Sequence, residues 1–167
     1  MSTLIGIIGH AGSGKDTVAD LLVDLCVASN IQYARHSLAT PIKIVARDEF
    51  DWNGKKDEDG RQLLIDLGMV GRKYKEDLWL NKTLEFFRVW NRPVSIIPDV
   101  RFENEADHIF NNGGFLIRVV RKSVVPLAHI SERGLDDYLT AITLHNDGTL
   151  EELREELYSE MERINAL

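Results

Sequence analysis

The amino-acid sequence predicts an α/β fold around a mainly parallel sheet. Five short apolar runs alternate along the chain with stretches of helical periodicity, the pattern of strand–helix–strand units. The first run leads directly into a glycine-rich turn and then a helix. The length of 167 residues suits one domain, and 44% hydrophobic with 28% charged residues is the balance of a soluble globular chain.

The first strand and the first helix are the most clearly marked elements. Residues 3–8 form an apolar run that ends at Gly9, as expected of a buried strand. Residues 15–28 carry apolar side chains at helical spacing and predict an amphipathic helix. The inner face of that helix is expected to hold Val18, Leu21, Leu22 and Leu25.

The middle of the chain is predicted to be mainly helical. A weaker strand is expected around 32–36. Thr40 and Pro41 suit an N-cap and a first helical residue, which opens a helix to about residue 50. A polar loop at 51–60 and two helices, at 61–67 ending at Gly68 and at 74–91, are expected to follow.

The last part alternates again between strands and helices. Strands are expected at 93–99, 115–120 and 139–144, and a helix at 102–112 closed by Gly113-Gly114. Thr149 and Glu152 form a capping-box pattern that opens a C-terminal helix. Its predicted core stripe is Leu150, Leu153, Leu157, Met161 and Ile164.

Composition excludes several classes of protein. Acidic residues outnumber basic ones by 27 to 20, for a net charge of −7, whereas a general nucleic-acid binder needs a basic field. A single cysteine, Cys26, excludes an internal disulfide and predicts a buried, reduced thiol. No apolar run approaches the roughly 20 residues that span a bilayer, and no basic start of a signal peptide is present. We therefore expect a cytoplasmic protein.

The segment Gly9 to Lys15, G-H-A-G-S-G-K, fits the P-loop pattern G-x-x-x-x-G-K between a strand and a helix. Backbone N–H groups of such a loop converge on phosphate oxygens, and the helix N-terminus adds partial positive charge. Lys15 is expected to reach the β- and γ-phosphates as a point charge. The predicted ATP-binding residues of this segment are His10, Ala11, Gly12, Ser13, Gly14, Lys15, Asp16 and Thr17.

The residue after the P-loop lysine departs from the general pattern. Asp16 stands where Ser or Thr would hold magnesium, and Thr17 follows. Either Asp16 binds the ion, directly or through water, or Thr17 supplies the hydroxyl. Because a carboxylate beside phosphates is tolerable only with a cation between them, we expect strict dependence on a divalent metal.

A second candidate segment is Ile96 to Arg101, which places Asp99 at the end of a buried strand. In a parallel sheet this end lies beside the P-loop, so Asp99 is expected to hold the water shell of Mg²⁺. Arg101 is expected to bind a phosphate through its guanidinium fork. The alternative is that Asp99 caps the next helix and Arg101 forms a surface ion pair.

These features favour a small P-loop kinase. The base-reading motif of GTPases is absent from the sequence, because Asn81-Lys82-Thr83 is followed by Leu84. An ATPase motor would be longer. The irregular segment 121–138 is expected to be a mobile cover.

Taken together, several segments resemble the bacteriophage deoxynucleoside monophosphate kinases. They occur in the family's order between residues 5 and 153, singly weak but jointly specific. The segments are Gly12 to Thr17 (GSGKDT), Leu38 to Lys43 (LATPIK), Arg61 to Leu64 with Leu67-Gly68, Pro98 to Arg101 with Glu105 and Asp107, Ile117 to Arg121, His129 to Glu132, and Asn146 to Leu153.

The resemblance implies a three-layer, adenylate-kinase-like P-loop kinase fold with a mobile lid at about 121–138. It implies one domain, 1–167, with an acceptor-binding helical region at about 40–92. The reaction it implies is transfer of the ATP γ-phosphate to a deoxynucleoside monophosphate (dNMP), giving dNDP and ADP, with Mg²⁺ as cofactor.

The resemblance also implies residue roles. The catalytic set is Lys15, Asp99, Arg101 and Arg121, and the metal set is Asp16, Thr17 and Asp99. Arg121, Asn146 and Gly148 add to the ATP side. The acceptor side is Ser37, Lys43, Arg61, Arg72, Arg101, His129 and Glu132.

Two departures from the family pattern concern base selection and the hinge of the lid. The stretch Gly68 to Arg72 is shorter and more apolar than usual, and Arg121 is followed by Lys122 instead of Pro. Trp79 is expected in the core, with stacking on a base as the alternative.

Two other functions remain open at this stage. One is another small-molecule P-loop kinase, with a CoA precursor, a sugar or phosphomevalonate as acceptor; the other is a nucleotide-binding regulator without turnover. The expected partners are ATP and dNMP, with no nucleic acid and no membrane. The sequence leaves a homodimer open, and the compartment is the host cytoplasm if the gene belongs to a phage.

Overall fold

The computed structural model describes residues 3–124 and 135–166. They fall into two compact units, Met1–Arg35 with Asn91–Leu167, and His36–Trp90. The elements of the first unit are β1 (Thr3–Ile8), α1 (Lys15–Ala28), β2 (Tyr33–Arg35), β3 (Val94–Ile97), α5 (Glu103–Asn111), β4 (Phe115–Val120), β5 (Ile142–His145) and α6 (Leu150–Arg163). The second unit contains α2 (Ala39–Phe50), α3 (Glu58–Tyr74) and α4 (Leu78–Trp90).

The first unit is built on a parallel five-stranded sheet, which confirms the predicted fold class. The strand order is β2-β3-β1-β4-β5. Each neighbouring pair is parallel. β1 is therefore central, with β3 on one side and β4 on the other. This places the start of the P-loop in the middle of the sheet's carboxyl edge.

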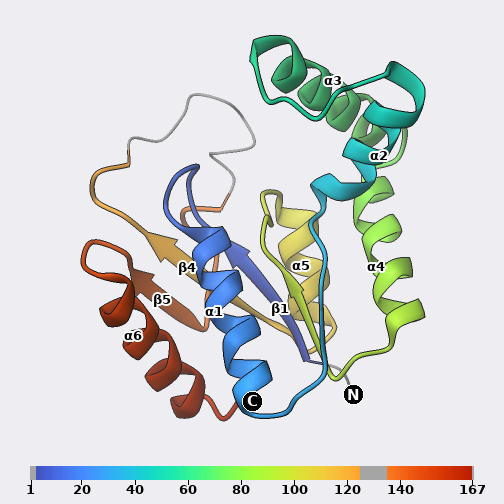
Figure 1. Cartoon of the computed structure of the whole chain (residues 1–167). Helices are drawn as coiled ribbons and strands as arrows, with labels where there is room; N and C mark the ends of the chain where they lie inside the picture. The colour runs from blue at the N-terminus through green and yellow to red at the C-terminus, as the bar shows by residue number, and fades with distance from the viewer. Residues whose placement is uncertain (1–2, 125–134, 167) are drawn as a thin grey trace. The chain divides into compact units, whose positions relative to one another are not determined.

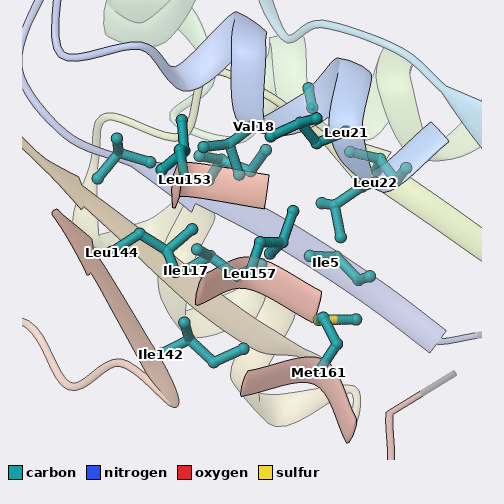
Figure 2. Close-up of a cluster of buried hydrophobic side chains, with 14 of the residues drawn as sticks. Ile5, Val18, Leu21, Leu22, Ile117, Ile142, Leu144, Leu153, Leu157 and Met161 are labelled. Carbon is teal, nitrogen blue, oxygen red and sulfur yellow. The ribbon is translucent and has the colours of Figure 1, made fainter. Parts of the chain in front are cut away.

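Helices cover both faces of the sheet and give three layers (Figure 1). Side chains of α1 and α6 pack against one face, where they form a continuous core (Figure 2). Ile5, Leu22 and Leu157 in this core are fully buried. Complete burial of a side chain of this size stabilises a fold by roughly 1.5–3 kcal/mol.

The opposite face of the sheet packs against α5. A Cβ at Gly6 would lie 2.5 Å from Ile109 and 2.6 Å from Leu116, so a larger residue on the central strand would force these side chains to shift. Ile109 is fully buried. Gly113, with φ at 74°, turns the chain after α5, as predicted for a helix closed by glycine.

The C-terminal helix follows its sequence pattern closely, with one exception. Thr149 and Glu152 form the predicted capping box. Leu153, Leu157 and Met161 are buried. Leu150 was expected in the core stripe but is 53% exposed, because it is the first helical residue and precedes the turn that meets the sheet.

The second unit consists of three mutually packed helices, and its boundaries differ most from the prediction. Gly68 does not end a helix: α3 continues to Tyr74. Gly71, three residues later, serves packing, because a Cβ there would lie 2.5 Å from the Trp79 ring. Trp79 Nε1 donates to the Gly68 carbonyl at 3.0 Å, and the side chain is buried. Trp79 is thus a core residue, and its surface for stacking on a base is covered.

Two further boundaries also moved. Thr40 is not the N-cap of α2, which begins at Ala39, whose backbone N–H donates to the Ser37 hydroxyl at 3.1 Å. The last strand begins at Ile142, because pairing with β4 starts there, opposite Ile117. Leu139, expected inside that strand, is 72% exposed.

Two expectations from composition concern the cysteine and membrane-spanning helices. Cys26 is buried as a free thiol, and burial raises its pKa, so it is protonated at neutral pH. Among the helices described, none has the length and apolar character required to cross a bilayer.

Candidate active site

Four loops of the first unit leave the sheet at the same edge. The chain passes from β1 into Gly9, from β3 toward Asp99, from β4 into Arg121 and from β5 into Asn146. Since the strands are parallel and in register, these four exits are neighbours. Ligands of open α/β sheets bind at this edge. The structure therefore places the start of the P-loop, the turn that carries Asp99, Arg121 and Asn146 along one edge of the sheet.

The P-loop needs its glycines at three positions. Gly9, Gly12 and Gly14 have φ angles of 144°, 82° and 104°, which side chains disfavour. A Cβ at Gly9 would lie 2.4 Å from the Val119 carbonyl oxygen. One at Gly14 would lie 2.2 Å from the amide nitrogen of Asn146. The loop thus wraps tightly before α1 begins at Lys15, as a phosphate cradle requires.

Lys15 places its charge inside this loop. Its ammonium donates to the carbonyl oxygens of Gly9 and His10, at 2.6 and 2.9 Å. Ser13 is 1% exposed, and within the described residues its hydroxyl has no hydrogen-bond partner. A buried donor beside an ammonium and a helix N-terminus is suited to the oxygen of an anion.

Asp16 has an arginine partner that the sequence did not suggest. Its carboxylate lies 3.4 Å from Arg35, while the other terminal nitrogen of Arg35 donates to Asp20. The Asp16 side chain is 89% exposed. The spacing of Asp16 and Asp20 by one helical turn was the available signal, but nothing in the sequence pointed to Arg35 at the end of β2.

The turn that carries Asp99 and Arg101 is fixed against the central strand. Val100 donates to the Ile7 carbonyl at 3.2 Å, two residues before the P-loop. The backbone N–H groups of Arg101 and Phe102 donate to Glu105 at 2.8 and 3.1 Å. Glu105 is 2% exposed. Its buried carboxylate therefore sets the backbone of this turn, a role beyond the dipole effect expected for an acidic residue at a helix start.

Asn146 contacts the P-loop directly. Its side-chain amide donates to the Ser13 carbonyl at 2.8 Å. Gly148 leaves room for Glu152, whose carboxylate would be 2.1 Å from a Cβ there. Of the two residues predicted on the ATP side of this loop, Asn146 therefore lies against the phosphate cradle and Gly148 lies at the α6 cap.

The segment expected to form the lid is described only at its two ends. Arg121 is exposed at the end of β4. At the other end, Asp136 lies 3.0 Å from His10 of the P-loop. The Tyr138 hydroxyl donates to Asp107; burial, together with that carboxylate, raises the pKa of Tyr138 to about 12 and keeps it a donor at neutral pH. His129 and Glu132, predicted on the acceptor side, lie outside the described residues.

The other acceptor-side candidates belong to the second unit, except Arg101. Ser37 precedes α2 and accepts from the Ala39 N–H. Lys43 lies on α2, and Arg61 and Arg72 lie on α3. Arg61 Nε donates to the Lys56 carbonyl at 2.9 Å, and a Cβ at Gly68 would lie 3.1 Å from the Arg72 guanidinium. Helices α2 and α3 thus carry three cationic candidates.

Comparison with known proteins identifies the family. A model of the family described as deoxynucleotide monophosphate kinase matches residues 60–157. A protein of Acanthamoeba polyphaga mimivirus described as a deoxynucleotide monophosphate kinase is 30% identical over 189 residues, covering 93% of this chain and 94% of its own. The chain belongs to the deoxynucleotide monophosphate kinase family. The expected family and enzyme class are confirmed, and the other acceptor classes and the non-catalytic regulator are disfavoured.

Solved structures show the fold of this kinase. The APS kinase of Mycobacterium tuberculosis, in complex with AMPPNP and APS, has a TM-score of 0.51 at 12% identity, with 96% of this chain and 98% of that chain covered. A gluconokinase from Sinorhizobium meliloti has a TM-score of 0.51 at 14% identity, with 98% and 93% covered. At such identities the likeness concerns the fold alone, which is that of P-loop kinases.

Proposed function

We propose that this kinase transfers the γ-phosphoryl group of ATP to the 5′-phosphate of a deoxynucleoside monophosphate. An acceptor phosphate oxygen forms a bond to the γ-phosphorus while the bond to the β–γ bridging oxygen breaks, and ADP and dNDP result. The observation that supports this most is the glycine-walled loop with the Lys15 ammonium inside it, at the sheet edge that also carries Asp99 and Arg121.

The residues act through position and charge. The acceptor is already an anion, so no general base is needed; the obstacle is repulsion between two polyanions. Lys15 and the loop N–H groups bind the β- and γ-phosphates of ATP. Arg121 stabilises the negative charge on the transferring group, and Arg101 holds the acceptor phosphate. Preorganised donors of this kind supply the largest part of such catalysis.

The acceptor is proposed to bind the helical unit His36–Trp90. Its candidates are Ser37, Lys43, Arg61 and Arg72, a hydroxyl and three cations suited to a phosphate monoester. His129 and Glu132 stay predictions for the base or sugar. Trp79 is excluded from base stacking by its burial and by its hydrogen bond to Gly68.

A magnesium ion fits the oxygen atoms available near the P-loop. Mg²⁺ is usually bound by one or two protein oxygens together with substrate phosphates. Thr17 supplies a hydroxyl and Asp99 a carboxylate, whereas the Asp16 carboxylate faces Arg35. When bound, the ion would neutralise phosphate charge. We therefore propose Thr17 and Asp99 as its protein partners, with Asp16 outside this set.

The proposed metal set predicts how two neighbouring substitutions differ. Thr17→Val keeps the shape and removes the hydroxyl, so it should raise the Mg²⁺ concentration for half-maximal activity by about tenfold, the effect of one lost charge-assisted contact. Asp16→Asn should change this Mg²⁺ concentration by less than about twofold. Excess EDTA should abolish turnover. A larger effect of Asp16→Asn than of Thr17→Val would return the metal role to Asp16.

A screen of acceptors tests the reaction itself. The purified chain, ATP and Mg²⁺ are incubated with each of the four dNMPs and four NMPs, and ADP formation is followed by a coupled assay. We expect rapid ADP release with at least one dNMP and slow release without acceptor, because water reacts poorly in a closed site. Turnover with one or more NMPs but with no dNMP would reject the proposed acceptor. Nucleotide binding without any turnover would reject the proposed transfer.

A further inference from the structure

The loop between β5 and α6 is attached to the P-loop. The side-chain amide of Asn146 donates to the Ser13 carbonyl at 2.8 Å, and its backbone N–H donates to the Val120 carbonyl at 2.8 Å. A single residue therefore contacts both the phosphate cradle and the last residue of β4, which directly precedes Arg121. The side-chain bond joins residues 133 positions apart in sequence, and the backbone bond joins the loop to the end of β4.

The next residue, Asp147, is attached to the other loop. One of its oxygens accepts the backbone N–H of Lys122 at 2.8 Å, and the other lies 3.6 Å from the Lys122 ammonium. The Lys122 side chain is 85% exposed, so the ion pair contributes little. The backbone bond is the stronger contact because its acceptor is charged and 29% exposed. It fixes the peptide that follows Arg121.

The loop between β5 and α6 is also fixed at the end that leads into α6. Glu152 accepts the backbone N–H of Thr149 at 2.7 Å, and the Thr149 hydroxyl accepts that of Glu152 at 3.2 Å. In the first two turns of α6, Leu153 and Leu157 are buried in the core. Asp147 therefore lies in a short loop whose two ends are fixed, one by β5 and the other by the packed helix α6.

We infer that Asp147 is a positioning residue for phosphoryl transfer. It holds the Lys122 amide, and thereby Arg121, at a fixed place relative to the P-loop that Asn146 contacts. The inference rests on the proposed role of Arg121. An arginine that acts in the transition state must be held to within about half an ångström, so loosening its backbone lowers the rate without weakening ATP binding.

Four variants test this inference: Asp147→Ala, Asp147→Asn, Lys122→Ala and, as a matched control, Glu151→Ala. Asp147→Ala removes the acceptor and should lower kcat about tenfold, with the ATP dissociation constant, measured by titration with a fluorescent ATP analogue, unchanged within twofold. Asp147→Asn keeps an oxygen acceptor and should retain at least a third of kcat. Lys122→Ala keeps the N–H and should cost at most twofold. Glu151→Ala removes an exposed partner of Arg154 and should have no effect.

The Arg121→Ala background separates positioning from general stability. There, Asp147→Ala should lower the residual rate by less than twofold, because no arginine remains to be positioned. A tenfold loss in that background, or a kcat of Asp147→Ala within twofold of wild type while Arg121→Ala is impaired, would overturn the inference and leave the proposed function intact. Full activity of Arg121→Ala would instead remove the proposed role of Arg121, and this inference with it.

Discussion

Replacing Lys15 by alanine should lower dNMP-dependent ADP formation by about 10²- to 10³-fold, the effect of losing one preorganised donor from a charge-stabilising site. The ammonium is the charge that the structure places inside the P-loop, 2.6 Å from the Gly9 carbonyl and 2.9 Å from that of His10. Alanine leaves the loop N–H groups in place but removes this charge from the phosphates. Both kcat and the affinity for ATP should fall, measured by the coupled ADP assay and by titration with a fluorescent ATP analogue.

Two further variants serve as controls for the Lys15→Ala prediction. Lys82→Ala removes an exposed lysine of α4 and should leave turnover within twofold of wild type. Lys15→Arg keeps the charge on a larger, planar group that the short distances to Gly9 and His10 do not accommodate, and it should remain at least tenfold impaired. Turnover of Lys15→Ala within fivefold of wild type, with an unchanged melting temperature, would show that the P-loop is not the phosphate site.

Most elements of the sheet unit could be predicted because strands, helix caps and glycine turns are indicated by residues that are neighbours in the sequence. The apolar runs at 3–8, 93–99 and 115–120 predicted buried strands, and the glycine after α5 and the capping box of α6 marked helix ends by backbone chemistry. In the helical unit the same rules failed. Gly68 suggested a helix end, but α3 continues past it: the Trp79 indole donates to the Gly68 carbonyl and its ring packs where a Cβ at Gly71 would lie. Tertiary packing overrode the local preference for a break there.

The candidate site, like the fold, could be predicted only in part from the sequence. The strand ends predicted that Asp99 lies beside the P-loop, since parallel strands share a carboxyl edge, whereas Arg121 and Asn146 were assigned to the site through the family resemblance. The residues that hold these groups were missed: Arg35 beside Asp16, Asp136 beside His10, and Asp147 beside Lys122. Each contact joins positions 19 or more residues apart without a motif. Periodicity identifies which face of an element is buried, but it does not indicate which polar side chains meet across loops.

Arg121→Ala should reduce kcat by about 10³-fold, by comparison with arginines that stabilise phosphoryl transfer. Arg121 is the first residue after β4, and its carbonyl accepts the Val124 N–H at 3.1 Å in a tight turn. Its side chain is exposed at the same sheet edge as the P-loop. An interaction made mainly in the transition state affects kcat and kcat/KM alike, so the ATP dissociation constant should change less than threefold.

Two further variants are compared with Arg121→Ala, one to separate the charge of the side chain from its planar shape and one as a control. Arg121→Lys keeps the charge but loses the planar fork, so its kcat should fall between those of wild type and Arg121→Ala. Arg154→Ala removes a half-buried arginine of α6 that pairs with Glu151 and should leave kcat within twofold. If Arg121→Ala instead raised KM for ATP and left kcat unchanged, Arg121 would bind the ground state only. The transition-state charge would then have to be stabilised by Lys15 and Arg101, and the double variant of those two residues would become the decisive measurement.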